Sequence, residues 1–465
     1  MSNDKRQKEY AEFIKWAIVL GAIYIPLISF LYWDTNSIIR CGIDVFKALF
    51  EGEIFDYYKY AGQSRDAGLM IHPPTYDFIF YVTVGIWELP IAILELVLGR
   101  DLERITYALI YSKTFLFLFI LLTAWMIYKI AKELQFNEKV AKCVVFMYLT
   151  SGLMISYTCI AGQYDIMGIF FSLVGVYFYL KGDMKKFGLM FVVAIQYKFF
   201  AVFIFLPLLL LKEKRMLRIA GYILPCVASI ILFRVPFIND GSIMEEKNGI
   251  NAGMFDKILG LNITIEVETI SLSLIAVGAV CLYCYFKEMS EDEIKYYAIY
   301  IPFLTLGILF LTFSFYPYWF IYIVPWIPLL FFMRDDMKEN FLWLETGMMG
   351  MLLLFQYAKY EWVFDIDNME NMFLSEILEE IYYFRIDLTT VYRPAVEKHL
   401  RLFYSFFWIF LATMLVVLRP KKGVVYKMEC DKWKNKLWLR FIGQYVISCF
   451  PIILYFINLF KLILS

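Results

Sequence analysis

Residues 185–215 have the sequence KKFGLMFVVAIQYKFFAVFIFLPLLLLKEKR, in which a single lysine interrupts a long apolar run between basic ends. About 20 apolar residues cross the hydrocarbon core of a bilayer as a helix, because a helix satisfies its own backbone hydrogen bonds. Basic loops favour the cytoplasmic side, and only an even number of crossings places both ends there. The run therefore predicts two short helices, residues 187–197 and 199–211, although one tilted helix could nearly fill it.

The same apolar pattern recurs along the whole chain. Of its 465 residues, 61% are hydrophobic, 20% are aromatic and 19% are charged, and a soluble domain of this length is less apolar. We predict an all-α fold, a polytopic transmembrane helical bundle with about 13 spans. The other expected spans are residues 13–33, 107–129, 140–160, 166–181, 219–238, 270–287, 296–315, 317–333, 341–361, 402–419 and 439–460.

Charge asymmetry sets the expected orientation. Basic residues gather at the N-terminus (Lys5, Arg6, Lys8 and Lys15) and in residues 181–186, 212–218 and 419–440. These segments are predicted to be cytoplasmic. Two acidic segments, residues 240–268 and 365–397, are predicted to lie outside. The turn at residues 287–295 is acidic but falls on the predicted inner side, which the charge rule does not explain.

A long segment after the first span, residues 34–104, is predicted to lie outside. Within it, residues 37–50 are typical of a short amphipathic helix ending at Gly52. Residues 72–99 are apolar enough to cross, but a crossing would place the basic residues of segment 129–142 outside. We expect residues 72–99 to form a helix that lies in the interface or dips in and returns. Such a long loop favours a functional role over a simple cap.

The composition excludes several kinds of site. The formal net charge is zero, so no basic surface indicates nucleic-acid binding. Only two histidines are present, which excludes a His-rich metal centre. The Cys281–Cys284 pair has a metal-ligand spacing, but it lies within an apolar helix and has no second pair. We interpret it as packing.

Two cations interrupt the apolar runs. Lys198 lies at the centre of its run, where a lysine costs several kcal/mol unless it is paired or hydrated, so it is a functional candidate. Arg234 lies near the outer end of its span. Two cations near one face fit a lipid phosphate or pyrophosphate. The alternative is snorkelling of the charge to the interface, which suits Arg234 better than Lys198.

Two polar turns are predicted at the same face. Gly162-Gln163-Tyr164-Asp165 connects two spans, and Asp165 is either functional or a cap for the helix beginning at Ile166. The second turn is Phe315-Tyr316-Pro317-Tyr318-Trp319. Tyrosine and tryptophan favour the interface of any membrane protein, so this turn alone is a weak signal.

The order of these features resembles the GT-C superfamily of polytopic glycosyltransferases. It looks closest to the branch with bacterial polyprenol-phosphate-mannose-dependent mannosyltransferases and the mannosyltransferase of GPI-anchor assembly. The corresponding residues are Asp34 or Asp44, Gly52, His72-Pro73-Pro74, Gly162 to Asp165, Lys198, and Ser314 to Trp319. The resemblance covers residues 1–335, and residues 336–465 are expected to be variable C-terminal helices with an outer loop at 363–400. His72 replaces the usual tyrosine, and the late turn departs from the family's Ser-Pro-x-Tyr.

The resemblance implies an inverting glycosyltransferase. It would move a hexose from a polyprenyl-phosphate-sugar donor to a hydroxyl acceptor, a glycan or a lipid-linked molecule, at the extracytoplasmic face. Asp34 is the expected general base, although the spacing to Gly52 fits Asp44 better in one version of the pattern. Lys198 would contact the phosphate. The other expected substrate-binding residues are Arg234, Gln163, Tyr164, Asp165, His72 and Tyr318. No cofactor is required, although some members use a divalent metal.

Two other classes of function are compatible with the sequence. A transporter or flippase for lipid-linked sugars would usually show two similar halves, and the Lys198 region has no counterpart in the second half. A polysaccharide polymerase or ligase would use a large late outer loop such as residues 363–400. Whichever function holds, we expect membrane lipids to surround the helices. The composition favours a bacterial plasma membrane.

Overall fold

The computed structural model describes residues 3–102, 105–240, 252–254, 256–257, 259, 261–265, 268–313, 315–359, 369–371, 397–421 and 431–450. The described residues are mostly helical, with 82% in helices and 2% in strands, so packing between helices builds the core. This predominance of helices is consistent with an all-α membrane protein.

The first half of the chain holds the helices that surround the candidate site. Its elements are α1 (Asn3–Ser29), β1 (Phe30–Tyr32), α2 (Trp33–Glu51), η1 (Ile54–Asp56), α3 (Tyr57–Asp66), α4 (Phe78–Leu98), α5 (Thr106–Glu133), α6 (Glu138–Leu149), α7 (Gly152–Met154), η2 (Ile155–Ile160), α8 (Asp165–Leu180), α9 (Met184–Tyr197), η3 (Phe199–Ala201), α10 (Val202–Lys212), α11 (Met216–Arg234) and η4 (Val235–Phe237). The segment η2 is a π-helix, and the other η segments are 3₁₀-helices.

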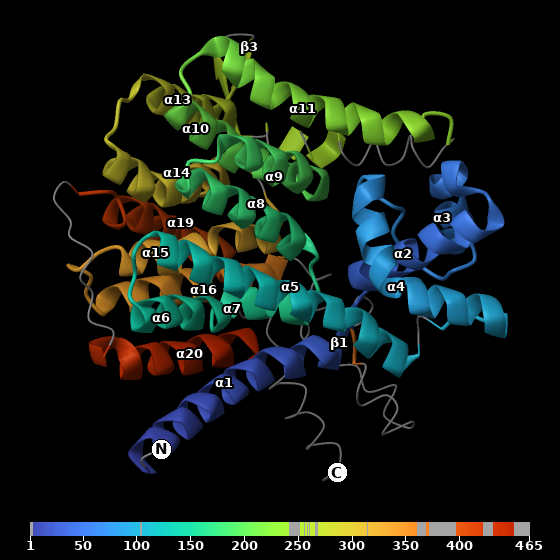
Figure 1. The fold of residues 1–465 in the computed structure, drawn as a ribbon, viewed down its shortest axis with the longest axis horizontal. Coiled ribbons are helices and arrows are strands. Elements are labelled where there is room, and N and C mark those ends of the chain that lie inside the picture. The colour runs from blue at the N-terminus through green and yellow to red at the C-terminus, as the bar shows by residue number, and fades with distance from the viewer. Residues whose placement is uncertain are drawn as a thin grey trace.

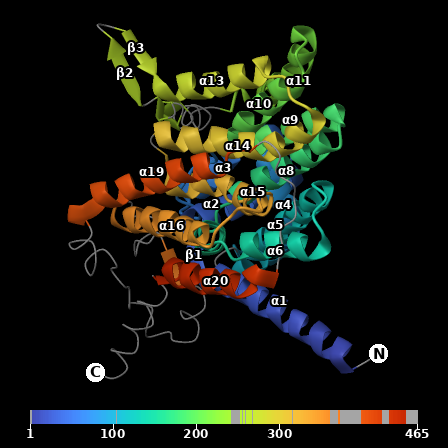
Figure 2. The same ribbon diagram turned by 90° about the vertical axis from the view of Figure 1, so that its left-hand side faces the viewer.

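The second half of the chain adds further helices that pack on those of the first half. Its elements are β2 (Asn262–Ile265), β3 (Glu268–Ser271), α13 (Leu272–Phe286), α14 (Glu291–Thr312), η5 (Pro317–Ile323), α15 (Trp326–Phe332), α16 (Asn340–Lys359), β4 (Met369–Asn371), η8 (Glu397–His399), α19 (Leu400–Val417), η9 (Asp431–Trp433) and α20 (Lys434–Ser448). In Figures 1 and 2, α13 lies at one edge of the molecule and α1 at the opposite edge, with α14 and α16 between them. Figure 1 also shows α2, α3 and α4 grouped at the end opposite the N-terminus, which we call the α2 end.

Six described helices are long and apolar enough to cross a membrane. They are Glu9–Ser29, Phe78–Leu98, Thr106–Glu133, Met216–Phe237, Glu291–Thr312 and Glu397–Val417. A bent pair, Glu138–Leu149 with Gly152–Ile160, makes a seventh if it forms one span. The 13 crossings expected from the sequence stay a prediction. Helix α4 qualifies as a span by length and composition, although we expected this segment to lie in the interface or to dip in and return.

The apolar run around Lys198 folds back on itself as a helical hairpin. Helix α9 ends at Tyr197, Lys198 is extended, and η3 begins at the next residue. The rings of Phe187 and Phe205 lie 5.4 Å apart. In one continuous helix these two positions would be about 27 Å apart, so the chain must turn back between them. At the open end of the hairpin, the Lys212 ammonium donates to the Tyr179 carbonyl. The two basic ends therefore lie on one side, as their charge predicted, and Lys198 lies at the tip.

The aromatic turn near Tyr318 lies at the centre of the bundle. All residues of η5 and α15 are buried. The ring of Trp319 contacts Phe200 at the hairpin tip, with 5.0 Å between ring centroids. This packing brings the second half of the chain against Lys198. Ser314, the first residue of the predicted turn motif, lies outside the described residues.

A short antiparallel pairing joins the end of the first helix to a late segment. Strand β1 pairs with β4, with Phe30 opposite Asn371. The acidic segment around residue 370 thus meets the chain just before α2, so both lie at the α2 end. The rest of the predicted outer loop, residues 363–368 and 372–396, lies outside the described residues, as do residues 451–460 of the last expected span.

Local capping explains the acidic turn at residues 287–295. The Ser290 hydroxyl accepts from the backbone N–H of Glu293, and the Glu293 carboxylate accepts from the backbone N–H of Ser290. This capping box places acidic residues in the first turn of α14, where the positive end of the helix dipole favours them. Acidic residues contribute little to membrane orientation, so the turn is compatible with an inner position.

The C-terminal helices pack directly on the first 335 residues. The Arg440 guanidinium of α20 forms a two-point ion pair with Glu345 of α16, and its third nitrogen donates to Thr150 after α6. Gln444 accepts from the Gly152 N–H, and Ser448 donates to the Gly152 carbonyl. The bend between α6 and α7 frees backbone groups, and α20 satisfies them.

Candidate functional site

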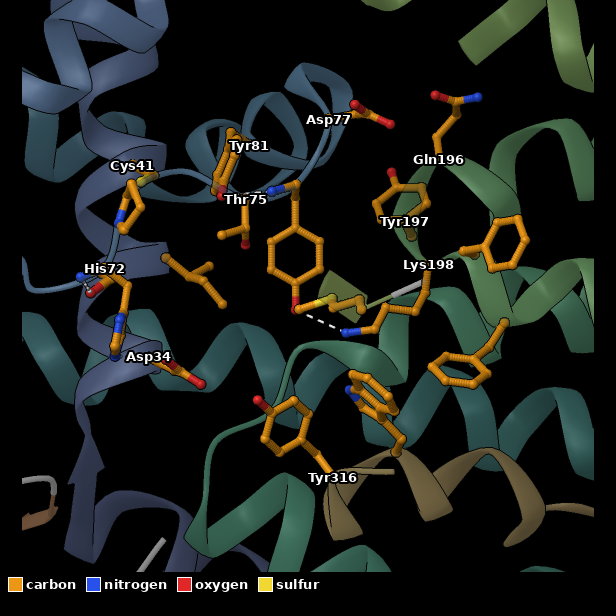
Figure 3. Close-up of a pocket in the computed structure, with 18 of the residues that line it drawn as sticks. Asp34, Cys41, His72, Thr75, Asp77, Tyr81, Gln196, Tyr197, Lys198 and Tyr316 are labelled. Carbon is orange, nitrogen blue, oxygen red and sulfur yellow. Dashed lines mark hydrogen bonds and ion pairs between the residues drawn. The ribbon is translucent and has the colours of Figure 1, made fainter. Parts of the chain in front are cut away.

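A cavity of about 650 Å³ lies where α2, α4, α11, the hairpin tip and η5 meet. Its lining combines aromatic rings with a few charged side chains, as Figure 3 shows. Among the described residues it is lined by Tyr32, Asp34, Ser37, Ile38, Cys41, His72, Pro73, Thr75, Tyr76, Asp77, Tyr81, Ile195, Gln196, Tyr197, Lys198, Phe199, Phe200, Ile230, Arg234, Met254, Tyr316, Tyr318 and Trp319. Five of the nine predicted site residues are in this lining.

Asp34 faces the cavity from the first turn of α2. Its side chain is 29% exposed, and one carboxylate oxygen lies 3.3 Å from Nε2 of His72. Burial raises the pKa of the Asp34 carboxyl above its ordinary value, and this effect exceeds the opposing attraction of His72 and Lys198. Asp34 therefore keeps a proton at higher pH than an exposed aspartate does.

Asp44, the alternative base, does not line the cavity. Its side chain is fully buried, and a carboxylate oxygen lies 2.9 Å from Nε of Arg40 on the same helix. Arg40 also pairs with Glu95 and Asp101, so Asp44 belongs to an ionic cluster that ties α2 to α4 and the loop after it. Burial raises the pKa of Asp44 to about 6. This carboxylate holds Arg40, and Arg40 joins α2 to α4.

The Gly162–Asp165 turn lies against the first turn of α2. The Thr35 hydroxyl donates to the Gly162 carbonyl at 3.1 Å, and Gly162 has a positive φ of 59°. A Cβ at Gly162 would clash with Thr35 Oγ1, so the contact requires glycine. The neighbouring Gln163 side chain is buried next to Asp34, whose pKa it lowers.

The last two residues of this turn have different environments. The Tyr164 ring is buried and packs against Phe80 and Phe115, away from the cavity lining. Asp165 does not cap α8: it is the first residue of that helix, and its carboxylate lies 2.8 Å from Nζ of Lys198. The capping interpretation was wrong because a buried ammonium attracts this carboxylate more strongly than backbone amides do.

Lys198 enters the cavity from the hairpin tip. Besides its ion pair with Asp165, the ammonium donates to the Tyr76 hydroxyl at 3.2 Å. It also lies 5.0 Å from the Tyr76 ring centroid and 5.8 Å from that of Trp319. The side chain is 11% exposed, into the cavity that it lines. Pairing and cation–π contacts compensate its desolvation.

Arg234 reaches the cavity from the end of α11 and binds Asp77. Its Nε and a terminal nitrogen donate to the two carboxylate oxygens at 2.9 and 3.2 Å. Asp77 precedes α4, so this ion pair joins α11 to α4 beside the cavity. Arg234 remains 43% exposed, and its charge is already compensated by Asp77.

The late aromatic turn forms one wall. The rings of Tyr316 and Tyr318 are stacked, with centroids 5.7 Å apart, and Tyr316 meets Trp319 edge to face. Pro317 begins η5, a position that proline favours. Flat aromatic faces bordered by polar groups bind sugar rings and lipid chains equally well, so this wall does not by itself choose a ligand.

Sequence reasoning missed two residues of the cavity lining, Tyr76 and Asp77, and one residue that contacts the lining, Lys257. Tyr76 and Asp77 lie in the predicted interface segment, but nothing in their spacing indicated partners more than 100 residues away. Lys257, whose ammonium donates to the Tyr316 hydroxyl and lies 3.7 Å from its ring, carried no sequence signal. Their contacts depend on the packing of distant helices.

No family model, curated protein or solved structure matches this chain. Within the described ranges, no group of three or more His, Cys, Asp or Glu side chains is placed to hold a metal ion. The charged lining consists of two carboxylates, Asp34 and Asp77, and two cations, Lys198 and Arg234, besides His72.

Proposed function

We propose that the chain is an inverting glycosyltransferase that moves a hexose from a polyprenyl-phosphate-sugar donor to a hydroxyl acceptor at the extracytoplasmic face. The observation that carries this proposal is the placement of Asp34 and Lys198 in one cavity, on different walls. In Figure 3 the two side chains point toward a common space. A base and a cation around one space suit a reaction that removes a proton at one end and forms an anion at the other.

Each step of the transfer has a side chain that suits it. The Asp34 carboxylate accepts the proton of the acceptor hydroxyl as the oxygen attacks the anomeric carbon. The bond from that carbon to the phosphate oxygen breaks, and its electron pair leaves with the lipid phosphate. Lys198 stabilises the growing negative charge. Attack from the side opposite to the leaving group inverts the anomeric centre.

The charge of the lining favours a donor with one phosphate. Two carboxylates face two cations, with His72 counted as neutral, so the described lining has no excess positive charge. Lys198 is also shared with Asp165. A phosphodiester adds one negative charge, whereas a diphosphate adds about two, and an uncompensated charge is costly in a partly buried site. A polyprenyl monophosphate sugar is therefore favoured over a diphosphate-linked one.

The length of the hairpin favours a membrane-anchored donor. Helix α9 has 14 residues, so it is about 21 Å long, compared with about 30 Å for the hydrocarbon core. With its basic end at one boundary, Lys198 lies about 9 Å below the other. A donor anchored by a polyprenyl chain reaches this depth more easily than a water-soluble nucleotide sugar does.

The test is a transfer assay with purified protein. Wild-type protein is incubated with a panel of polyprenyl-phosphate hexoses and candidate acceptors, and the release of polyprenyl phosphate is measured. Asp34→Asn should lower kcat about 100-fold or more, because it removes the base with little change in shape. Asp66→Asn, an exposed carboxylate of α3, is the matched control and should retain full activity.

Two results would contradict the proposal. Full activity of Asp34→Asn would remove Asp34 as the base. Movement of a lipid-linked sugar across liposomes by the wild type, without any release of lipid phosphate, would favour a flippase instead.

A further inference from the structure

His72 is held against Asp34 at the edge of the cavity. Its side chain is 49% exposed, and Nε2 lies 3.3 Å from the Asp34 carboxylate. Two further side chains near Asp34 at the start of α2, Asn36 and Ser37, hold the loop that carries His72. Asn36 donates to the Leu69 carbonyl at 3.3 Å, and the backbone N–H of His72 donates to Ser37 Oγ at 3.2 Å. The first turn of α2 thus holds both the carboxylate and the segment that brings the imidazole to it.

A base that works in a partly buried site must lose its proton after each turnover. Because burial raises the pKa of Asp34, its carboxyl retains the proton that it takes from an acceptor. The titratable and charged groups that face Asp34 are His72 from the loop before α4, Lys198 from the hairpin tip, Asp165 from α8, Tyr32 from β1, Tyr76 from the loop before α4 and Tyr318 from η5.

Only one of these groups is suited to accept a proton and pass it on. Lys198 is an ammonium paired with Asp165, so it has no lone pair to offer. The Asp165 carboxylate is bound to that ammonium and its side chain is fully buried, so it has no path for a proton to the solution. The three tyrosines hold their own protons at neutral pH. Imidazole gains and loses protons near neutral pH and has a nitrogen on each side of its ring, so it can accept on one side and release on the other.

We propose that His72 is the proton relay of Asp34, carrying the acceptor's proton from the buried carboxyl to the solution at the α2 end. This inference rests on the proposed function and adds the route by which the base is regenerated. His72 acts through Asp34, and it is not required to touch the sugar.

The atoms balance without a further reactant. The acceptor's O–H proton passes to the Asp34 carboxylate as the new glycosidic bond forms and the lipid phosphate leaves. Asp34 then gives this proton to Nε2 of His72. The imidazolium releases the proton of Nδ1 to water, and a shift between the two neutral tautomers restores the ring. Asp34 is again a carboxylate.

The test compares two variants of His72 with a matched histidine control. His72→Phe removes the relay and keeps a ring, whereas His72→Gly leaves space for added imidazole. We expect kcat to fall about 10- to 100-fold in both. Millimolar imidazole should restore the rate of His72→Gly and not that of His72→Phe. His399→Gln changes the one other histidine of the chain and should be neutral.

The pH profile gives a second readout that a packing role would not change. Transfer requires the Asp34 carboxylate, so activity is lost as pH falls through its raised pKa. A protonated His72 attracts the carboxylate and lowers this pKa, so His72→Phe should move the acid limb of kcat to higher pH.

The outcomes separate the relay from the function on which it rests. A wild type that is inactive with every donor overturns the proposed function and the relay with it. An active wild type with unchanged kcat and acid limb in His72→Phe overturns the relay alone. If His72→Phe fails to fold, the absence of imidazole rescue in folded His72→Gly overturns it equally.

Discussion

At Gly162 a single residue joins two parts of the candidate site. Its carbonyl accepts from Thr35, next to the proposed base, and its own chain continues to Gln163 and Asp165. The left-handed conformation and the short distance to Thr35 both exclude a side chain. The glycine therefore sets the distance between the carboxylate wall and the α8 wall of the cavity.

Replacement of this glycine should affect both stability and activity. Gly162→Ala forces a left-handed alanine, which costs about 1–2 kcal/mol, and pushes Thr35 away. We expect a lower Tm in detergent and a kcat reduced about 10-fold or more. Gly21→Ala in α1 is the matched control, because a Cβ there meets nothing within 4 Å. Equal effects of the two substitutions would contradict the proposed role of Gly162.

The choice between Asp34 and Asp44 also belongs to the residue scale. The two carboxylates lie ten residues apart on one helix, so they point about 80° apart around its axis and about 15 Å apart along it. One reaches the cavity and the other reaches Arg40. The sequence spacing to Gly52 favoured Asp44 in one version of the pattern, but spacing does not define the face on which a partner helix packs.

At the scale of elements, the α9–α10 hairpin determines which groups surround the Lys198 ammonium. The sequence placed this lysine in the middle of an apolar run, where it is expensive. The hairpin moves it to the tip, where Asp165, Tyr76 and Trp319 surround it. The same residues in one continuous helix would leave the ammonium facing lipid.

A pair of substitutions separates the chemical role of Lys198 from its structural role. Lys198→Met should reduce kcat/KM for the donor about 100-fold and destabilise the protein, because it leaves Asp165 buried without its cation. Adding Asp165→Asn to it should restore the Tm and leave the transfer rate low. Lys212→Met, at the open end of the hairpin, is the control for loss of a lysine.

Recovery of both stability and rate in the double variant would show that Lys198 serves only to balance Asp165. An equal loss for donor and acceptor would likewise favour a packing role over a contact with the donor phosphate.

At the scale of the whole molecule, the cavity lies at the α2 end and the basic turns of the hairpin lie at the other. If the basic ends are cytoplasmic, as their charge predicts, the cavity faces outward. The β1–β4 pairing adds that the late acidic segment shares the α2 end. Orientation thus links the electrostatics of the loops to the side on which the substrate is bound.

Cysteine labelling in intact cells tests this orientation. Asp66→Cys in α3 should react with a membrane-impermeant maleimide before lysis, and Lys185→Cys in the basic turn should react only after lysis. The wild type is the background control, since its six free described cysteines are buried. The reverse labelling pattern would place the cavity on the cytoplasmic side and contradict the proposed donor.

By itself the sequence predicted the helical class, several long apolar helices, two short helices on either side of Lys198 and the amphipathic helix that ends at Gly52. Each of these depends on neighbouring residues. A helix in an apolar environment satisfies its own backbone hydrogen bonds, and the length of an apolar segment decides whether it can cross a bilayer. Capping is equally local, yet of the two roles left open for Asp165 the cap is absent, and its carboxylate pairs with a distant ammonium instead.

Only the tertiary structure decided which charges meet. Arg234 binds a residue 157 positions earlier, and Lys198 binds a hydroxyl 122 positions earlier. The selection of Asp34 over Asp44, and its pairing with His72, depend on the face that α2 turns toward the cavity. Such pairings arise from packing between distant helices, and the local spacing of residues along the chain does not reveal those distances.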